Sequence, residues 1–212
     1  MTFLSITNTT KTFGTNAVVK GFDLAVQKGE LVSFLGPSGC GKTTVLRMIA
    51  GFETPTAGRV VIDGRDVTDL SPNRRRIGMV FQSYALFPNM YVAANVGFRL
   101  KIAGMTRPEA DARVAEMLKR IGLSHLAARY TYEMSGSQQQ RVAFARALAP
   151  MPQVLLLDEP QSALRFSDSQ ILRFAIRCAR RSAHFSASLA SPPVSWPMNR
   201  KWPCRSRTGS WS

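Results

Sequence analysis

The sequence is short of cysteine, of acidic residues and of long apolar runs. Its three cysteines, Cys40, Cys178 and Cys204, are widely spaced among 212 residues, so they predict neither a disulfide framework nor a zinc site. No apolar run approaches the ~20 residues of a membrane-spanning helix, and the N-terminus lacks the charged-then-apolar order of a secretory signal. These absences predict a reduced, cytosolic protein that forms one domain with room for an inserted subdomain.

Acidic residues are scarcest at the end of the chain. The formal net charge is +15, and residues 165–212 carry nine of the 28 Lys and Arg residues but one of the 13 Asp and Glu residues. The same segment holds all three tryptophans. A positive charge this high suggests that the protein binds nucleic acid. Because the excess is concentrated in the last quarter of the chain, it argues against nucleic-acid binding by residues 1–164. We therefore predict a folded core over residues 1–164 and an atypical, disordered tail over residues 165–212.

One glycine-rich run predicts nucleotide binding. It fills every fixed position of the G-x-x-x-x-G-K-[ST] phosphate loop. Small residues let backbone N–H groups approach a polyphosphate. Lys42 supplies a cation for the β and γ oxygens, and Thr43 supplies a hydroxyl for Mg²⁺. The predicted nucleotide-binding residues of this loop are Gly36, Pro37, Ser38, Gly39, Cys40, Gly41, Lys42, Thr43 and Thr44.

The segments around this loop have the expected strand-before, helix-after pattern. Residues 3–35 are predicted as an antiparallel β region whose last strand, Glu30–Leu35, leads into the loop. Val45–Ala50 is predicted as the following helix, whose positive end favours anions. Phe13 lies in the first loop, where an aromatic ring could stack on a base. By itself, a phenylalanine there is also compatible with a core position.

Two polar positions farther along the chain, on either side of a helical region, are candidates for chemistry. The apolar strand Ile77–Phe81 delivers Gln82 at its carboxyl end, where ligands bind in α/β sheets. Residues 83–132 have helical periodicity, over 94–102 and 107–121. Ser135 is predicted as the N-cap of a helix that ends at Leu148, and its Ser-Gly start favours anion binding.

A second apolar strand ends in two acids. Val154–Leu157 is continuously apolar, which suits a central parallel strand. Asp158 and Glu159 follow it, and adjacent acids are costly there unless they face a cation or a water to be activated. Asp158 suits a Mg²⁺ shell and Glu159 suits a general base. The alternative is a solvated strand end.

In order and spacing, these elements resemble the ATP-binding subunits of ABC transporters over roughly residues 3–164. The phosphate loop, the glutamine loop at Gln82, the signature at Met134–Gln138, the Walker B strand with its acids, and the aromatic at Phe13 all agree. The resemblance implies an α/β fold: a P-loop NTPase (RecA-like) core with an N-terminal antiparallel β region and a small helical subdomain at about residues 83–150. Residues 81–90 look like those of importers for polyamines, ferric iron, phosphonates or similar solutes.

The resemblance also implies a mechanism. Two subunits close on two ATP molecules with Mg²⁺. Thr43, Gln82 and Asp158 organise the metal and water, with Gln82 and Glu159 as the catalytic residues. Permease subunits are the direct partners and a solute-binding protein an indirect one, at the cytoplasmic face of the inner membrane. No nucleic-acid partner is expected. The residues implied to contact the γ-phosphate in trans are Ser135, Gly136 and Gln138.

The chain departs from the family pattern at several positions. Ser137 replaces the second signature glycine, Arg165 replaces an aspartate, and His184 does not match the histidine that follows a strand in the family. When residues 194–212 are translated back into a gene sequence with suitable codons and that sequence is read two nucleotides farther on, it can encode LVAHEQEVALPISDRIVV. This stretch resembles the missing histidine strand of the family. We therefore hypothesise that residues 165–212 include a frameshifted product.

Three readings of function follow. The first is the ATPase subunit of a small-solute importer, impaired by the lost motifs. The second is a degenerate ATP-binding protein without turnover, and the third is a nucleic-acid binder that uses the basic tail. Soluble ABC ATPases of DNA repair or translation usually carry a second cassette or large insertions, which 212 residues do not accommodate. Selectivity resides in partner subunits, so the sequence does not identify the solute.

Overall fold

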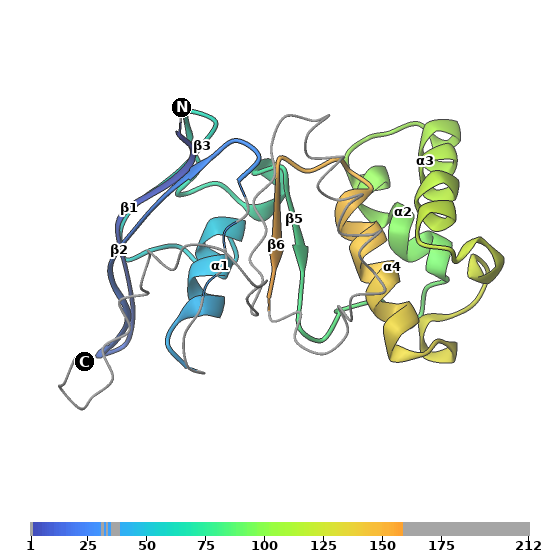
Figure 1. The fold of residues 1–212 in the computed structure, drawn as a ribbon, viewed down its shortest axis with the longest axis horizontal. Helices are drawn as coiled ribbons and strands as arrows, with labels where there is room; N and C mark the ends of the chain where they lie inside the picture. Colours follow the sequence, from blue (N-terminus) through green and yellow to red (C-terminus); the bar gives the residue numbers. More distant parts are fainter. Residues whose placement is uncertain (1, 31, 33, 35–38, 159–212) are drawn as a thin grey trace, which may run out of the picture. The chain divides into compact units, whose positions relative to one another are not determined.

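The computed structural model describes residues 2–30, 32, 34 and 39–158 (Figure 1). The chain divides into two compact units. The first unit runs to Arg75 and the second begins at Arg76. Among the described residues, no helix has the length and apolarity needed to cross a membrane. The segment expected as the strand Glu30–Leu35 falls largely outside the described residues.

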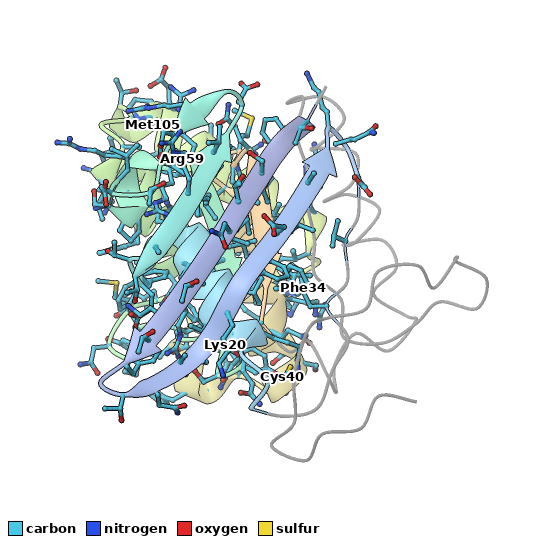
Figure 2. All side chains as sticks on the ribbon, turned by 90° about the vertical axis from the view of Figure 1, so that its left-hand side faces the viewer. Lys20, Phe34, Cys40, Arg59 and Met105 are labelled. Carbon is cyan, nitrogen blue, oxygen red and sulfur yellow. The ribbon has the colours of Figure 1, made fainter. Side chains whose placement is uncertain are left out.

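An antiparallel sheet forms the first unit, with the strand order β2-β1-β3-β4. Figure 2 shows β2, β1 and β3 side by side, seen from the face turned away from helix α1. The expected antiparallel β region is therefore present. Residues 17–26 belong to one strand, β2, whose pairing with β1 shifts register at irregularities. The strands are β1 Thr2–Phe13, β2 Asn16–Gln27, β3 Ala57–Ile62 and β4 Arg65–Asp66.

The core of this unit follows from cross-strand pairing. Two rows of buried apolar side chains cross β2, β1 and β3, because residues at a spacing of two share a face of a sheet. Helix α1, Lys42–Ala50, lies alongside this sheet and buries most of its own apolar residues (Figure 1). The two rows are Val26, Leu4 and Ile62, and then Leu24, Ile6 and Val60.

Helix α1 ends where the sequence predicts, at Gly51. This residue has φ 84°, a left-handed conformation that favours glycine. A Cβ atom there would lie 2.5 Å from Nε of Arg75. The Arg75 side chain is buried and donates hydrogen bonds to the carbonyl oxygens of Met48 at 2.6 Å and Ile49 at 2.9 Å. Burial lowers the pKa of Arg75, and the cation stabilises the negative end of the helix.

The second unit holds a parallel strand pair and a group of helices. Strands β5, Ile77–Val80, and β6, Val154–Leu157, pair in parallel and are fully buried, as the continuous apolar run predicts. Gly78 permits the close approach of α4, since a Cβ atom there would lie 2.6 Å from the Ala147 carbonyl oxygen. The helices are α2 Val92–Ile102, α3 Arg107–Arg120 and α4 Gly136–Leu148, and the short 3₁₀ turns are η1 Pro72–Arg74 in the first unit, with η2 Ser124–Leu126 and η3 Thr131–Glu133 in the second.

Candidate functional site

The described end of the phosphate loop is shaped by left-handed glycines. Gly39 has φ 81° and Gly41 has φ 94°, and Gly41 is the N-cap of α1. A Cβ atom at Gly41 would lie 3.2 Å from the Val18 carbonyl oxygen, so the start of α1 lies close against β2. Because amide groups of a first helical turn point out of the helix, this geometry presents donors to an anion.

The cation and hydroxyls of the loop lie in that first turn. Lys42, Thr43 and Thr44 open α1 and are half-buried, and the first turn carries no acidic residue to oppose an anion. The Lys42 ammonium lies 3.6 Å from Sγ of Cys40, so both side chains occupy the same end of the helix. The remaining predicted residues of the loop lie outside the described part of the chain: Gly36, Pro37 and Ser38.

Phe13 is exposed at the end of β1, next to the two-residue loop that joins β1 to β2. Its side chain is 47% exposed, so the alternative that it is a core residue does not hold. The ammonium of Lys11 lies 4.9 Å from the centre of its ring. Sequence reasoning missed Lys11, because it placed Phe13 in a loop; the structure extends β1 to Phe13, and residues two apart on a strand share a face.

Gln82 and Asp158 lie at the same carboxyl edge of the second unit's parallel pair. Val80 is in register with Leu157, and the Asp158 amide donates to the Val80 carbonyl oxygen at 3.0 Å. Gln82 is exposed just beyond β5, and Asp158 is 8% exposed just beyond β6. The structure thus brings these two predicted residues to one edge. Glu159 lies outside the described residues.

The segment after Gln82 has an unusual backbone. Tyr84 has φ 60° and Ala85 has φ 46°, a left-handed conformation that is costly for residues other than glycine. The guanidinium of Arg146, on α4, donates to the carbonyl oxygen of Ala85 at 2.7 Å and to that of Tyr84 at 2.9 Å. Burial lowers the pKa of Arg146. A buried arginine on the signature helix therefore fixes the chain that follows Gln82.

Asn95 holds the next part of the same segment. This α2 side chain is fully buried. It accepts a hydrogen bond from the Phe87 amide at 2.8 Å and donates to the carbonyl oxygens of Phe87 and Met90, both at 3.1 Å. The sequence analysis did not single out Asn95 or Arg146, because nothing in the local pattern shows which distant carbonyl groups they meet.

The signature residues form the capped start of α4. Ser135 is the N-cap, as predicted, and its amide donates to Oε1 of Gln138 at 2.9 Å, while the Gln138 amide donates to Oγ of Ser135 at 3.4 Å. Oγ of Ser135 also lies 3.2 Å from Oγ of Ser137. Gly136 is exposed, with open space where a Cβ atom would lie.

The oxygen donors predicted for a metal fit Mg²⁺ in kind. A threonine hydroxyl, a glutamine amide oxygen and a carboxylate are hard oxygen ligands, and Mg²⁺ in phosphate sites uses one or two protein carboxylates with water and phosphate oxygens. Within the described residues, no cluster of three or more His, Cys, Asp or Glu residues gathers.

Comparison with known proteins identifies the family of this chain. Residues 19–162 match the family described as ABC transporter. The Fe(3+) ions import ATP-binding protein FbpC of Photorhabdus laumondii is 50% identical over 175 residues, which are 82% of this chain and 50% of that protein. The spermidine/putrescine import ATP-binding protein PotA of Mesorhizobium japonicum is 52% identical over 167 residues, which are 77% of this chain and 46% of that protein. The chain thus spans about half the length of these curated relatives.

Solved structures show the same fold. The ATP-binding cassette MJ0796, in a dimeric post-hydrolysis state bound to ADP and Pi, matches with a TM-score of 0.80 at 33% identity, covering 89% of this chain and 88% of that one. A second dimeric structure of MJ0796, described as a bacterial ABC transporter cassette, matches with a TM-score of 0.79 at 34% identity, covering 88% and 87%. The predicted α/β cassette fold is confirmed.

Proposed function

Because the chain belongs to the ABC transporter family, we propose that it binds and hydrolyses ATP as the energy-coupling subunit of an importer for a small solute. One observation carries the proposal: helix α1 begins at Lys42 directly after the left-handed Gly41, inside the stretch that matches the family. This start combines backbone donors, a cation and the positive helix end, which are the groups that a triphosphate requires.

The predicted site residues of the first unit bind the nucleotide. Lys42 and the amide groups of the loop hold the β- and γ-phosphates, and the exposed Phe13 ring stacks on the base. Thr43, Gln82 and Asp158 would supply oxygen ligands for Mg²⁺. When bound, that ion neutralises the charge that develops on the phosphate oxygens.

Hydrolysis requires a water molecule to be oriented and deprotonated. The water oxygen attacks the γ-phosphorus while Glu159 accepts a proton from that water. The bond between the γ-phosphorus and the oxygen that bridges the β- and γ-phosphates then breaks, and ADP leaves. Gln82 positions this water through its amide group. The place of Asp158 supports this proposal, because the residue is buried just beyond β6, at the same strand edge as Gln82.

The site is completed by a second copy of the chain. Ser135, Gly136 and Gln138 would contact the γ-phosphate of ATP bound to the other subunit, and the exposed, capped start of α4 supports this contact. The MJ0796 cassette is itself dimeric. Permease subunits are the membrane partners, a solute-binding protein acts indirectly, and the dimer lies at the cytoplasmic face of the inner membrane. The relatives named above import ferric ions or spermidine and putrescine, so a small cationic solute is the class to test first.

Glu159→Gln tests binding, hydrolysis and dimerisation together. The unaltered chain should release phosphate from ATP with Mg²⁺. Glu159→Gln should bind ATP but lose at least roughly 100-fold in turnover, the scale of a general base, and should accumulate as dimers during gel filtration with ATP. Lys42→Ala is the matched control that should lose ATP binding itself. Tight binding by the unaltered chain without phosphate release, with permease present, would contradict hydrolysis and leave a binding protein.

A further inference from the structure

The Phe13 ring at the end of β1 has the Lys11 ammonium on one of its faces. The Lys11 ammonium lies 4.9 Å from the centre of the Phe13 ring, within the range of a cation–π interaction. Phe13 is 47% exposed, whereas the Lys11 side chain is 14% exposed. The pair thus combines an open aromatic ring with a largely covered cation.

Two oxygen atoms fix the ammonium in this position. Nζ of Lys11 lies 3.0 Å from Oε2 of Glu53 and donates to the carbonyl oxygen of Thr54 at 2.8 Å. A lysine ammonium has three donors and a flexible stem, so these two contacts remove most of its freedom. The ion pair with Glu53 also keeps the charge from moving toward a bound triphosphate.

The loop of residues 52–56, which supplies both contacts to Lys11, is hydrogen-bonded to the rest of the unit at both ends. The Phe52 amide donates to the Arg47 carbonyl oxygen of α1 at 2.9 Å, and the Thr56 amide donates to the Thr10 carbonyl oxygen of β1 at 2.8 Å. The Thr12 amide donates to Oγ1 of Thr56 at 3.1 Å. Lys11 therefore connects the ring to the carboxyl end of the helix whose amino end carries the phosphate loop.

The ring and the phosphate loop are also neighbours along β2. Phe13 pairs with Asn16, and Gly41 lies against the Val18 carbonyl group. Two residues of strand, about 7 Å, separate these positions. A nucleotide whose phosphates lie at α1 can therefore reach the Phe13 ring with its base.

We propose that Lys11 is a positioning residue for the nucleotide base: it occupies one face of the Phe13 ring and leaves the opposite face for the base. This inference rests on the proposed function. The cation attracts the ring electrostatically and limits its rotation, so the ring is oriented before the base arrives. Lys11 contributes to binding of the base and not of the phosphates, because Glu53 and the Thr54 carbonyl group hold its ammonium beside the ring.

Lys11→Met tests this by keeping the stem and removing the charge. Binding of ATP and of inorganic tripolyphosphate, which lacks a base, is measured by titration calorimetry on the full chain. ATP binding should weaken roughly three- to fivefold, with tripolyphosphate binding unchanged. Lys11→Arg should restore most of the loss, because a guanidinium also pairs with a carboxylate and stacks on a ring. Lys20→Met, an exposed lysine of β2 labelled in Figure 2, is the matched control and should change neither affinity.

A second variant separates positioning from folding. Phe13→Ala should weaken ATP binding by itself, and Lys11→Met should add nothing in that background. Glu53→Gln should cause a smaller loss than Lys11→Met while leaving the fold intact. Equal weakening of ATP and tripolyphosphate by Lys11→Met, or an unchanged ATP affinity, would overturn the assignment. If the unaltered chain bound neither ligand, the proposed function would fail and this inference with it.

Discussion

Ser137 places a second hydroxyl group at the start of the signature helix. Its Oγ lies 3.2 Å from Oγ of Ser135, the group proposed to contact the γ-phosphate in trans. Ser137→Gly should free the Ser135 hydroxyl and remove bulk. A net hydrogen bond is worth about 1 kcal/mol, so phosphate release should rise roughly fivefold. The same change should lower the free energy of unfolding by about 0.5–1 kcal/mol, because glycine is a poor helix former.

Ser137→Ala is the control that distinguishes the hydroxyl from the bulk. It removes the hydroxyl and keeps the Cβ atom. If both variants raise turnover alike, the hydrogen bond to Ser135 is responsible; if only the glycine variant does, the bulk is. Unchanged turnover in both would contradict an inhibitory role of Ser137.

Residues whose roles depend on local spacing could be predicted from the sequence, and residues whose partners are distant could not. Gly41, Lys42 and the Ser135 cap follow from short motifs, since their geometry is set within a few positions. Lys11 depends on Glu53, which lies 42 residues later. Only the fold shows that the two side chains meet.

At the scale of elements, Arg146 joins α4 to the strained chain after β5. Its two hydrogen bonds reach the carbonyl oxygens of Tyr84 and Ala85, both in left-handed conformations. Ala85→Gly should raise the free energy of unfolding by about 1 kcal/mol, because glycine adopts a positive φ without strain. Urea unfolding of the full chain measures this change.

Arg146→Ala should lower the free energy of unfolding by about 2–4 kcal/mol, because two part-buried carbonyl groups lose a charged donor and the buried arginine stem leaves a void. The loss should be smaller when Ala85→Gly is also present, since the arginine then holds a less strained segment. Arg129→Ala, an exposed arginine outside this cluster, should have little effect. Simple additivity of the Arg146 and Ala85 changes would contradict the coupling.

Most element types could be predicted, but pairing and register could not. Helix α3 covers Arg107–Arg120, one residue short of the predicted span, and α2 begins at Val92, two residues before it. Hydrophobic periodicity sets these helices locally. The position of β1 between β2 and β3 depends on contacts between distant segments, which periodicity does not specify.

At the scale of the whole molecule, the motifs are distributed over two compact units. The phosphate loop and Phe13 belong to the first, and Gln82, the signature and Asp158 belong to the second. The order of motifs in the sequence was enough to predict the cassette. The departures at Arg165 and His184 lie outside the described residues, so the frameshift hypothesis stays a prediction. Sequencing the gene tests it directly, since an alternative frame must encode the histidine strand.

Restoring the alternative frame over residues 194–212 should raise ATP hydrolysis. The restored stretch would bring back a histidine that, by the resemblance, contacts the γ-phosphate. A hydrogen bond that strengthens as charge develops on the phosphate lowers the activation barrier. Removing a single oxyanion donor from other enzymes costs about 3 kcal/mol, or roughly 100-fold in rate, and we expect a gain of that size. Phosphate release by both chains under the same conditions measures this gain. A third version with that histidine changed to alanine is the control and should lose most of it. Equal rates for the present and restored chains would show that hydrolysis does not depend on the replaced residues.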